Sequence, residues 1–256
     1  MEYEIKGGDE IMIIDIHAHV GRSWLAWEEN TVTVEDMLKI YDDCGIEKAC
    51  INSWLLAYDP PAGNNEVYEI VKKYPDRFIG FGVISPRWSP NAADEVDRCI
   101  NDLNMKGIKM HPTLNTWAAD SPIVYPVMER IQKYDVPVLF HTWSDDLSHP
   151  SRVGKIAKLF PDVTILMGHM GWEAFYEAAF LAKELPNVYL DTTGFYNEIR
   201  TLREVVRIAG KEKVVFGTDA PALNVYAEIA KIKFGDISED AKKAIFYENA
   251  KKLLKL

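Results

Sequence analysis

Short apolar runs alternate with amphipathic stretches along the whole of this chain. Eight of these runs, each four to six residues long, are rich in valine and isoleucine. That composition is typical of parallel strands that are buried on both faces. The predicted strands are Ile11–Ile16, Lys48–Asn52, Phe78–Val83, Gly107–Met110, Val136–Phe140, Val163–Met167, Val188–Asp191 and Lys213–Phe216.

Between the strands, apolar residues recur at spacings of three and four, which is typical of helices with one buried face. The first helix has clear boundaries, because Thr33 precedes acidic residues in its first turn and Gly45 follows its last residue. The predicted helices are Thr33–Cys44, Asn64–Tyr74, Asn91–Leu103, Ile123–Tyr134, Ser151–Phe160, Trp172–Leu185, Glu198–Ala209, Ala222–Lys231 and a closing helix Ser238–Leu254.

Eight strand–helix units in 256 residues match the size of a (β/α)8 barrel of the TIM type. An open doubly wound sheet is the alternative, and we rank it lower because no glycine-rich phosphate turn follows the first strand. No linker or repeat interrupts the pattern. We therefore predict a single domain over residues 1–256, with residues 1–11 as an N-terminal extension and an extra helix at the C-terminus.

The composition narrows the choice of partners. The net charge is −10 and long basic runs are absent from the sequence, which argues against a nucleic-acid partner. No apolar stretch approaches the ~20 residues of a membrane span. The three cysteines lack a CxxC spacing, so they do not form a disulfide framework and favour a reducing compartment. We expect a cytoplasmic protein that acts on a small molecule, with neither a membrane nor a nucleic acid as partner.

Five of the six histidines lie at or just after the C-terminal end of an apolar run. His17 and His19 are two residues apart in an extended segment, so their side chains point to the same side. Active sites of such barrels form at the C-terminal ends of the strands, and imidazole is a common metal ligand. We predict four metal ligands at this end of the barrel: His17, His19, His141 and Asp219.

Plainer interpretations exist for each of these residues. A single histidine in an apolar run is usually part of the core, and Asp219 could cap a helix near Pro221. Five histidines at equivalent places in a radial fold favour the functional interpretation. His169 lies between glycines that permit a tight turn, and we predict that it acts beside the metal. The predicted catalytic residues are Asp219 and His169.

Positive charge gathers at the same end of this acidic protein, which suggests an anionic substrate, most simply a carboxylate. Lys109 could bind that carboxylate, could be carboxylated and bridge two metals, or could extend to solvent at the barrel rim; we favour the first. Tryptophans could form flat walls for an aromatic or unsaturated acid, or could simply cover the barrel mouth. The predicted substrate-binding residues are Lys109, His111, Arg22, Arg87, Trp54 and Trp143.

These residues, in this order, resemble the amidohydrolase superfamily, in particular the group that includes aminocarboxymuconate-semialdehyde decarboxylase-like enzymes. The resemblance implies a divalent metal, Zn²⁺ with Mn²⁺ as the alternative, held by the four predicted ligands, and it implies a homodimer. It extends along almost the whole chain and is carried by Asp15–His19, Tyr74–Phe78, Gly107–Pro112, Phe160–Asp162, Gly168–Gly171, Asn187–Asp191, Gly217–Asp219 and Glu248–Leu254.

We predict a metal-dependent hydrolase that acts on a small, carboxylate-bearing substrate through a metal-activated water, with protons moved by Asp219 and His169. The first alternative is a non-oxidative decarboxylase of an aromatic or unsaturated acid in the same group. The second is a TatD-like metal-dependent deoxyribonuclease, although such enzymes carry a glutamate where this chain has Lys109. The third is a metal-binding barrel without turnover.

Overall fold

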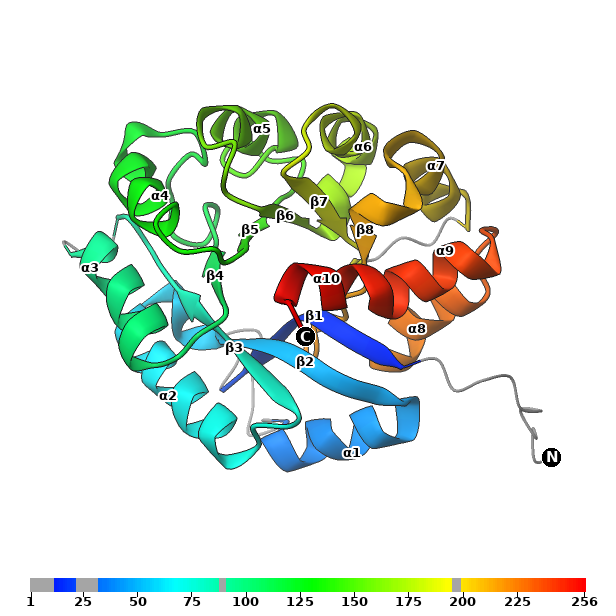
Figure 1. The fold of residues 1–256 in the computed structure, drawn as a ribbon, viewed down its shortest axis with the longest axis horizontal. Coiled ribbons are helices and arrows are strands. Elements are labelled where there is room, and N and C mark those ends of the chain that lie inside the picture. Colours follow the sequence, from blue (N-terminus) through cyan, green and yellow to red (C-terminus); the bar gives the residue numbers. More distant parts are fainter. Residues whose placement is uncertain (1–11, 22–31, 88–90, 195–198) are drawn as a thin grey trace.

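The barrel predicted from the sequence is the fold of this chain. The computed structural model describes residues 12–21, 32–87, 91–194 and 199–256. Within these residues, eight parallel strands lie side by side in chain order and helices surround them (Figure 1). The strands are β1 (Ile13–Val20), β2 (Ile46–Ser53), β3 (Phe78–Val83), β4 (Gly107–Met110), β5 (Val138–His141), β6 (Ile165–Gly168), β7 (Val188–Asp191) and β8 (Val214–Val215).

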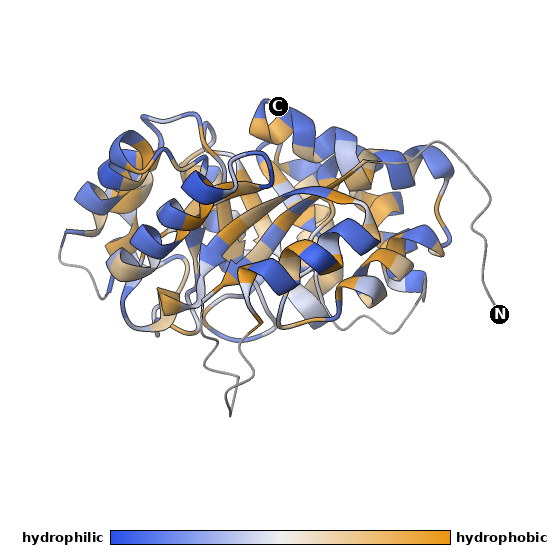
Figure 2. Cartoon of the chain, turned by 90° about the horizontal axis from the view of Figure 1, so that it is seen from below, coloured by the Kyte–Doolittle hydropathy of each residue, from blue (hydrophilic) through white to orange (hydrophobic). Residues whose placement is uncertain are grey.

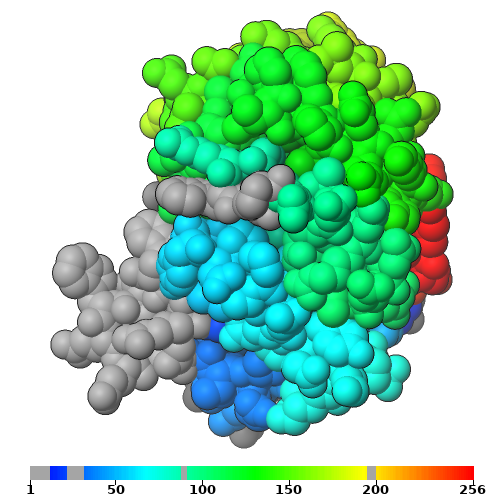
Figure 3. Space-filling view, turned by 90° about the vertical axis from the view of Figure 1, so that its left-hand side faces the viewer, coloured from blue at the N-terminus to red at the C-terminus, as the bar shows by residue number. Residues whose placement is uncertain are grey.

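The helices form an outer layer with polar outer faces and apolar inner faces (Figure 2). Figure 3 shows the side on which the segments containing α1, α2 and α3 follow one another. The helices are α1 (Val34–Cys44), α2 (Pro60–Lys73), α3 (Ala92–Asp97), α4 (Tyr125–Ile131), α5 (Pro150–Leu159), α6 (Phe175–Glu184), α7 (Ile199–Ala209), α8 (Val225–Lys233), α9 (Glu239–Lys243) and α10 (Asn249–Leu254).

Helix α1 begins where the sequence predicts. The Thr33 hydroxyl accepts a hydrogen bond from the backbone N–H of Asp36 at 3.1 Å, and the Asp36 carboxylate accepts one from the backbone N–H of Thr33 at 3.0 Å. This reciprocal pair satisfies two donors that the first turn would otherwise leave open. The helix ends at Gly45, whose φ of 72° suits a residue without a side chain.

Several boundaries differ from the prediction: α2 begins at Pro60, four residues early, and the predicted closing helix is divided into α9 and α10. Strand β1 continues to Val20 instead of ending at Ile16, because its later residues pair with β2. The helix predicted over Asn91–Leu103 is α3 followed by a wider π-helical turn at Arg98–Asp102. The helix predicted to start at Trp172 starts later, after a distorted turn.

The barrel closes between β1 and the chain that follows the very short β8. The backbone N–H of Ile16 donates to the Phe216 carbonyl at 2.9 Å, and that of His19 donates to the Ala220 carbonyl at 2.7 Å. These bonds bring residues at opposite ends of the sequence together. The segment after β8 therefore lies directly beside the two histidines of β1.

An apolar core fills the barrel at the opposite end from those histidines. Three of its members are the second residue of their strands, Ile79, Leu139 and Leu166, whereas the polar His19 lies near the C-terminal end of β1. Leu253 and Leu254 of α10 pack against it from outside, where the C-terminus overlies the barrel in Figure 1. The core residues are Ile16, Cys50, Ile79, Phe81, Leu139, Leu166 and Val215. No helix in the described part of the chain is long and apolar enough to span a membrane.

Candidate active site

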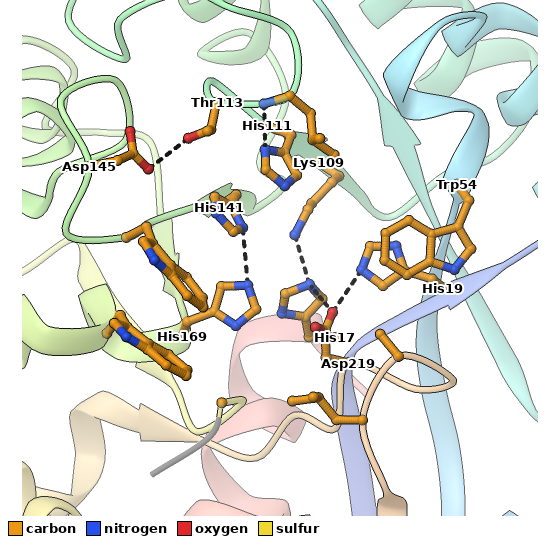
Figure 4. Close-up of a pocket in the computed structure, with 16 residues that line it drawn as sticks. His17, His19, Trp54, Lys109, His111, Thr113, His141, Asp145, His169 and Asp219 are labelled. Carbon is orange, nitrogen blue, oxygen red and sulfur yellow. Dashed lines mark hydrogen bonds and ion pairs between the residues drawn. The ribbon is translucent and has the colours of Figure 1, made fainter. Parts of the chain in front are cut away.

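Three of the four predicted metal ligands come together at the C-terminal end of the barrel (Figure 4). His17 and His19 project from β1, and Asp219 follows β8. One nitrogen or oxygen from each lies within 4.8 Å of the others. The Asp219 Oδ1 atom is 2.9 Å from His19 Nε2 and 3.4 Å from His17 Nε2. The spacing of the histidines and the position of the aspartate thus produce the predicted cluster.

The backbone holds Asp219 in an unusual conformation. Its φ is 56°, in the left-handed region that few residues other than glycine adopt, and its N–H donates to the His17 carbonyl at 2.7 Å. It is not the cap of the following helix, because Asn224 caps α8 by accepting a hydrogen bond from the Ala227 N–H. The capping interpretation of Asp219 is therefore wrong.

A buried carboxylate orients His17. The Nδ1 atom of His17 is 2.8 Å from Asp191 Oδ2, and both side chains are fully buried. Burial opposes ionisation of Asp191, but His17 and the neighbouring hydrogen bonds outweigh it and lower its pKa to about 2. A carboxylate on one imidazole nitrogen directs the other toward a metal, and His17 Nε2 faces Asp219 in this way.

The charge states in the cluster suit a divalent cation. Burial lowers the pKa of His19 to about 3, so that its imidazole is neutral. Burial also opposes the charge on Asp219, but the hydrogen bond from His19 and the neighbouring His17 hold its pKa well below the ordinary value. Imidazole nitrogens and a carboxylate oxygen are a donor set that first-row divalent metals take. The residues present therefore fit the metal that was predicted.

The fourth predicted ligand, His141, lies beside this cluster without joining it. Its Nδ1 atom is 3.1 Å from His169 Nε2, and its ring stacks on His111 at 3.7 Å between centroids. His169 follows β6 and lies 5.1 Å from His17, ring centre to ring centre. Both histidines face the same cavity as the cluster, and the ligand role of His141 stays a prediction.

Lys109 points into the site. Its Nζ atom is 2.7 Å from His17 Nε2, and only 1% of the residue is exposed. Burial lowers its pKa to about 8. The alternative in which Lys109 extends to solvent at the barrel rim is therefore wrong, and its ammonium group is available to an anion in the cavity.

The cavity above these residues has a volume of about 600 Å³ and aromatic walls. Trp54 stacks on His19 with ring centres 3.9 Å apart. On the other side, Trp143 stacks on Trp172 at 4.1 Å with 14° between the ring planes. His111 lines the same cavity, so four of the predicted substrate-binding residues meet here: Lys109, His111, Trp54 and Trp143.

Of the two predicted arginines, Arg87 does not join them. Arg87 is exposed, donates a hydrogen bond to the Thr116 hydroxyl at 2.6 Å, and is not among the described residues that line the cavity. Arg22 lies outside the described residues. Among the described lysines and arginines, Lys109 is therefore the one that lines this cavity.

Sequence reasoning gave no role to three residues that shape the site. Trp172 belongs to a distorted turn in which Met170 and Trp172 both have positive φ, and the glycines around His169 were its only signal. Asp191 and Thr193 lie at the end of β7 and contact His17 and His169. The position of Asp191 at the end of a buried strand was a signal in the sequence. Its partner, His17, is distant in the sequence, so the contact itself could not be predicted.

The chain belongs to the amidohydrolase superfamily, as predicted: the family model described as "Amidohydrolase" matches residues 14–256. It is similar to the gamma-resorcylate decarboxylase of Polaromonas, with 23% identity over 92% of this chain and 91% of that protein. A 2-amino-3-carboxymuconate-6-semialdehyde decarboxylase of Dictyostelium discoideum is 30% identical over 31% of this chain and 22% of its own length. The protein is accordingly an enzyme of this superfamily.

Solved structures share the fold. A dihydroxybenzoic acid decarboxylase from Polaromonas, with bound manganese and 2-nitroresorcinol, has a TM-score of 0.80 at 20% identity, covering 95% of this chain and 97% of that one. A 5-carboxyvanillate decarboxylase from Novosphingobium aromaticivorans, also with manganese, has a TM-score of 0.75 at 20% identity, covering 98% of each chain.

Proposed function

We propose that this protein is a metal-dependent, non-oxidative decarboxylase of an aromatic carboxylic acid. The observation that carries the proposal is a metal-binding trio and a buried lysine at the base of a cavity with stacked aromatic walls. Sequence reasoning placed hydrolysis first and decarboxylation second. Relatives over most of the chain are gamma-resorcylate decarboxylases, which favours the second.

His17, His19 and Asp219 would hold the metal, with His141 as the proposed fourth ligand. When bound, a divalent metal supplies a Lewis acid that orients and polarises anionic oxygens of the substrate. Zn²⁺ was the expected ion. Two of the similar solved structures contain manganese, so we propose Mn²⁺ ahead of Zn²⁺.

The lysine and the tryptophans that line the cavity have different proposed roles. The Lys109 ammonium group would bind the substrate carboxylate, because a buried charge interacts strongly with an opposite charge. Trp54, Trp143 and Trp172 would stack on a planar ring and exclude water. An aromatic acid satisfies both demands at once.

Decarboxylation requires one proton at a ring carbon. The bond between that carbon and the carboxylate breaks, its electrons stay on the ring carbon, and a proton replaces the departing CO2. Asp219 is ionised in the site, so it would first accept a proton from the substrate and then return it to the carbon. His169, whose pKa burial lowers to about 4, would assist as a neutral partner.

The test combines metal content with product analysis. We expect about one metal per chain in protein purified without chelator, and release of CO2 from 2,6-dihydroxybenzoate or another ring acid of a small panel. His17→Ala should lose both metal and turnover. His149→Asn is the matched control, because His149 lies on a loop outside the cavity and asparagine can still cap α5. Hydrolysis of lactones or amides without CO2 release would instead support the hydrolase.

A further inference from the structure

The hydroxyl group of Thr193 lies behind the metal site, in contact with His17, His169 and Asp191. Its Oγ1 atom is 2.5 Å from Asp191 Oδ1, 2.9 Å from His169 Nδ1 and 3.4 Å from His17 Nδ1. Thr193, Asp191 and His17 are completely buried, and His169 is 4% exposed. The direction of each hydrogen bond in this group therefore depends on the residues themselves.

Counting hydrogens fixes those directions. A threonine hydroxyl has one hydrogen, and an ionised carboxylate can only accept. The short contact with Asp191 therefore uses the hydrogen of Thr193, and the Thr193 oxygen must accept from His169. His17 does not compete for this position, because its Nδ1 already donates to the other oxygen of Asp191 at 2.8 Å.

We propose that Thr193 is a positioning residue that fixes the tautomer of His169, with hydrogen on Nδ1 and with Nε2 as the atom that exchanges protons. Nε2 faces His141 at 3.1 Å, in the cavity (Figure 4). When His169 is neutral, the hydrogen between the two rings belongs to His141 Nδ1, so that His141 presents its Nε2 for the metal. The catalytic consequence rests on the proposed function, whereas the tautomer does not.

The hydroxyl contributes little to holding the backbone, because its contact with the backbone N–H of His169, at 3.3 Å, is the longer of the two that this N–H makes. Asp191 Oδ1 also accepts from the backbone N–H groups of His169 at 2.8 Å and Thr193 at 3.0 Å, and these bonds fix both loops. The methyl group of Thr193 packs against Gly217. Packing and hydrogen bonding therefore belong to different atoms of one side chain and can be removed separately.

Two variants make this separation. Thr193→Val keeps the branched shape and the methyl group but loses the hydroxyl, whereas Thr193→Ser keeps the hydroxyl and loses the methyl. Thr192→Val is a matched control, because the Thr192 hydroxyl accepts from the Gly217 N–H at 3.3 Å and is not hydrogen-bonded to any of the described histidines. A structural role would make Ser the worse substitution at position 193, and a positioning role would make Val the worse one.

The first readout is the ¹⁵N spectrum of histidine in the zinc-loaded enzyme, with His169 assigned by its loss in His169→Gln. We expect the Nδ1–H tautomer in the wild type and in Thr193→Ser, and a shift toward Nε2–H in Thr193→Val. An Nε2–H tautomer in the wild type would overturn the proposal, even if Thr193→Val did not fold.

The second readout is turnover of the manganese-loaded enzyme with the ring acid found above. We expect Thr193→Val to lower kcat by about 10- to 100-fold with KM and metal content nearly unchanged, and Thr193→Ser and Thr192→Val to stay near the wild type. Equal kcat in Thr193→Val and Thr193→Ser would overturn the catalytic role. If the wild type releases no CO2 from any acid, the proposed function fails, and the spectrum still decides the tautomer.

Discussion

The buried side chains of this site differ in charge: two of its imidazoles are neutral, whereas two of its carboxylates are ionised. Burial keeps the imidazoles of His19 and His169 neutral by lowering their pKa to about 3 and about 4. Burial also opposes ionisation of Asp191 and Asp219, but nearby histidines and hydrogen bonds overcome it there. The site thus combines a neutral His19 imidazole and an ionised Asp219 with a lysine whose ammonium group points into the same site.

Replacing that lysine tests the binding of the substrate carboxylate. We expect Lys109→Gln to raise KM for the ring acid about 10- to 100-fold, because a hydrogen bond to a charged group contributes roughly 1.5–3 kcal/mol. Steady-state kinetics measure the change. Lys106→Gln is the control, since Lys106 is exposed just before β4. An unchanged KM in Lys109→Gln would assign carboxylate binding to other groups.

Among the elements, α8 carries a buried acidic residue toward the loop that follows β7. Glu228 is 4% exposed, and the Lys231 Nζ lies 2.5 Å from its Oε2. Lys231 in turn donates to the backbone carbonyls of Thr192 at 3.2 Å and Gly194 at 2.5 Å. This pair connects α8 to the segment that carries Thr193.

The pair predicts a pH dependence of stability. Burial raises the pKa of Glu228 to about 8, so the folded protein keeps a proton that the unfolded chain loses near pH 4.3. Its contribution is therefore complete below about pH 4.3 and is lost as the pH rises through about 8. We expect the wild type to lose on the order of 2 kcal/mol more than Glu228→Gln between pH 5 and pH 8.

Urea unfolding at a series of pH values measures this difference. Glu239→Gln serves as the control, because Glu239 is exposed on α9. If the curves of the wild type and Glu228→Gln are parallel over this range, Glu228 is ionised in the folded protein.

Over the whole molecule, the candidate metal site bridges the seam at which the barrel closes. Strand β8 has two residues, and closure depends on backbone bonds from the segment after it to β1. His17 and His19 lie on one side of that seam and Asp219 on the other. A bound cation would therefore connect the first strand to the last and stabilise the entire barrel. The predicted homodimer and cytoplasmic location stay predictions.

Metal should raise the stability of the protein. A ligand present at about 100 times its Kd contributes roughly 2.7 kcal/mol, which corresponds to about 5–10 °C in Tm for a domain of this size. We expect Mn²⁺ to raise Tm by that amount, EDTA to reverse it, and His17→Ala to abolish it. Calorimetry of the wild type and of His149→Asn, with and without metal, provides the comparison. The same rise in His17→Ala would place the bound metal elsewhere.

The sequence by itself determined the order of strands and helices, and it indicated most of the site. Burial on both faces produces continuous apolar strands, and a residue spacing of two places His17 and His19 on one side of β1. Parallel strands in a barrel bring their C-terminal ends together, so Asp219 could be assigned from its place after the eighth strand. These inferences need only local periodicity and one topological rule.

The tertiary structure alone decided which side chains touch. Lys109 and His17 are 92 positions apart, and His17 and Asp191 are 174 apart. Their contacts depend on the tilt and register of strands, which one-dimensional periodicity does not contain. For the same reason the sequence could not show that Arg87, which follows a strand as the other site residues do, bonds to Thr116 outside the cavity. The position of Thr193 between two histidines likewise depends on how the closed barrel brings distant strands together.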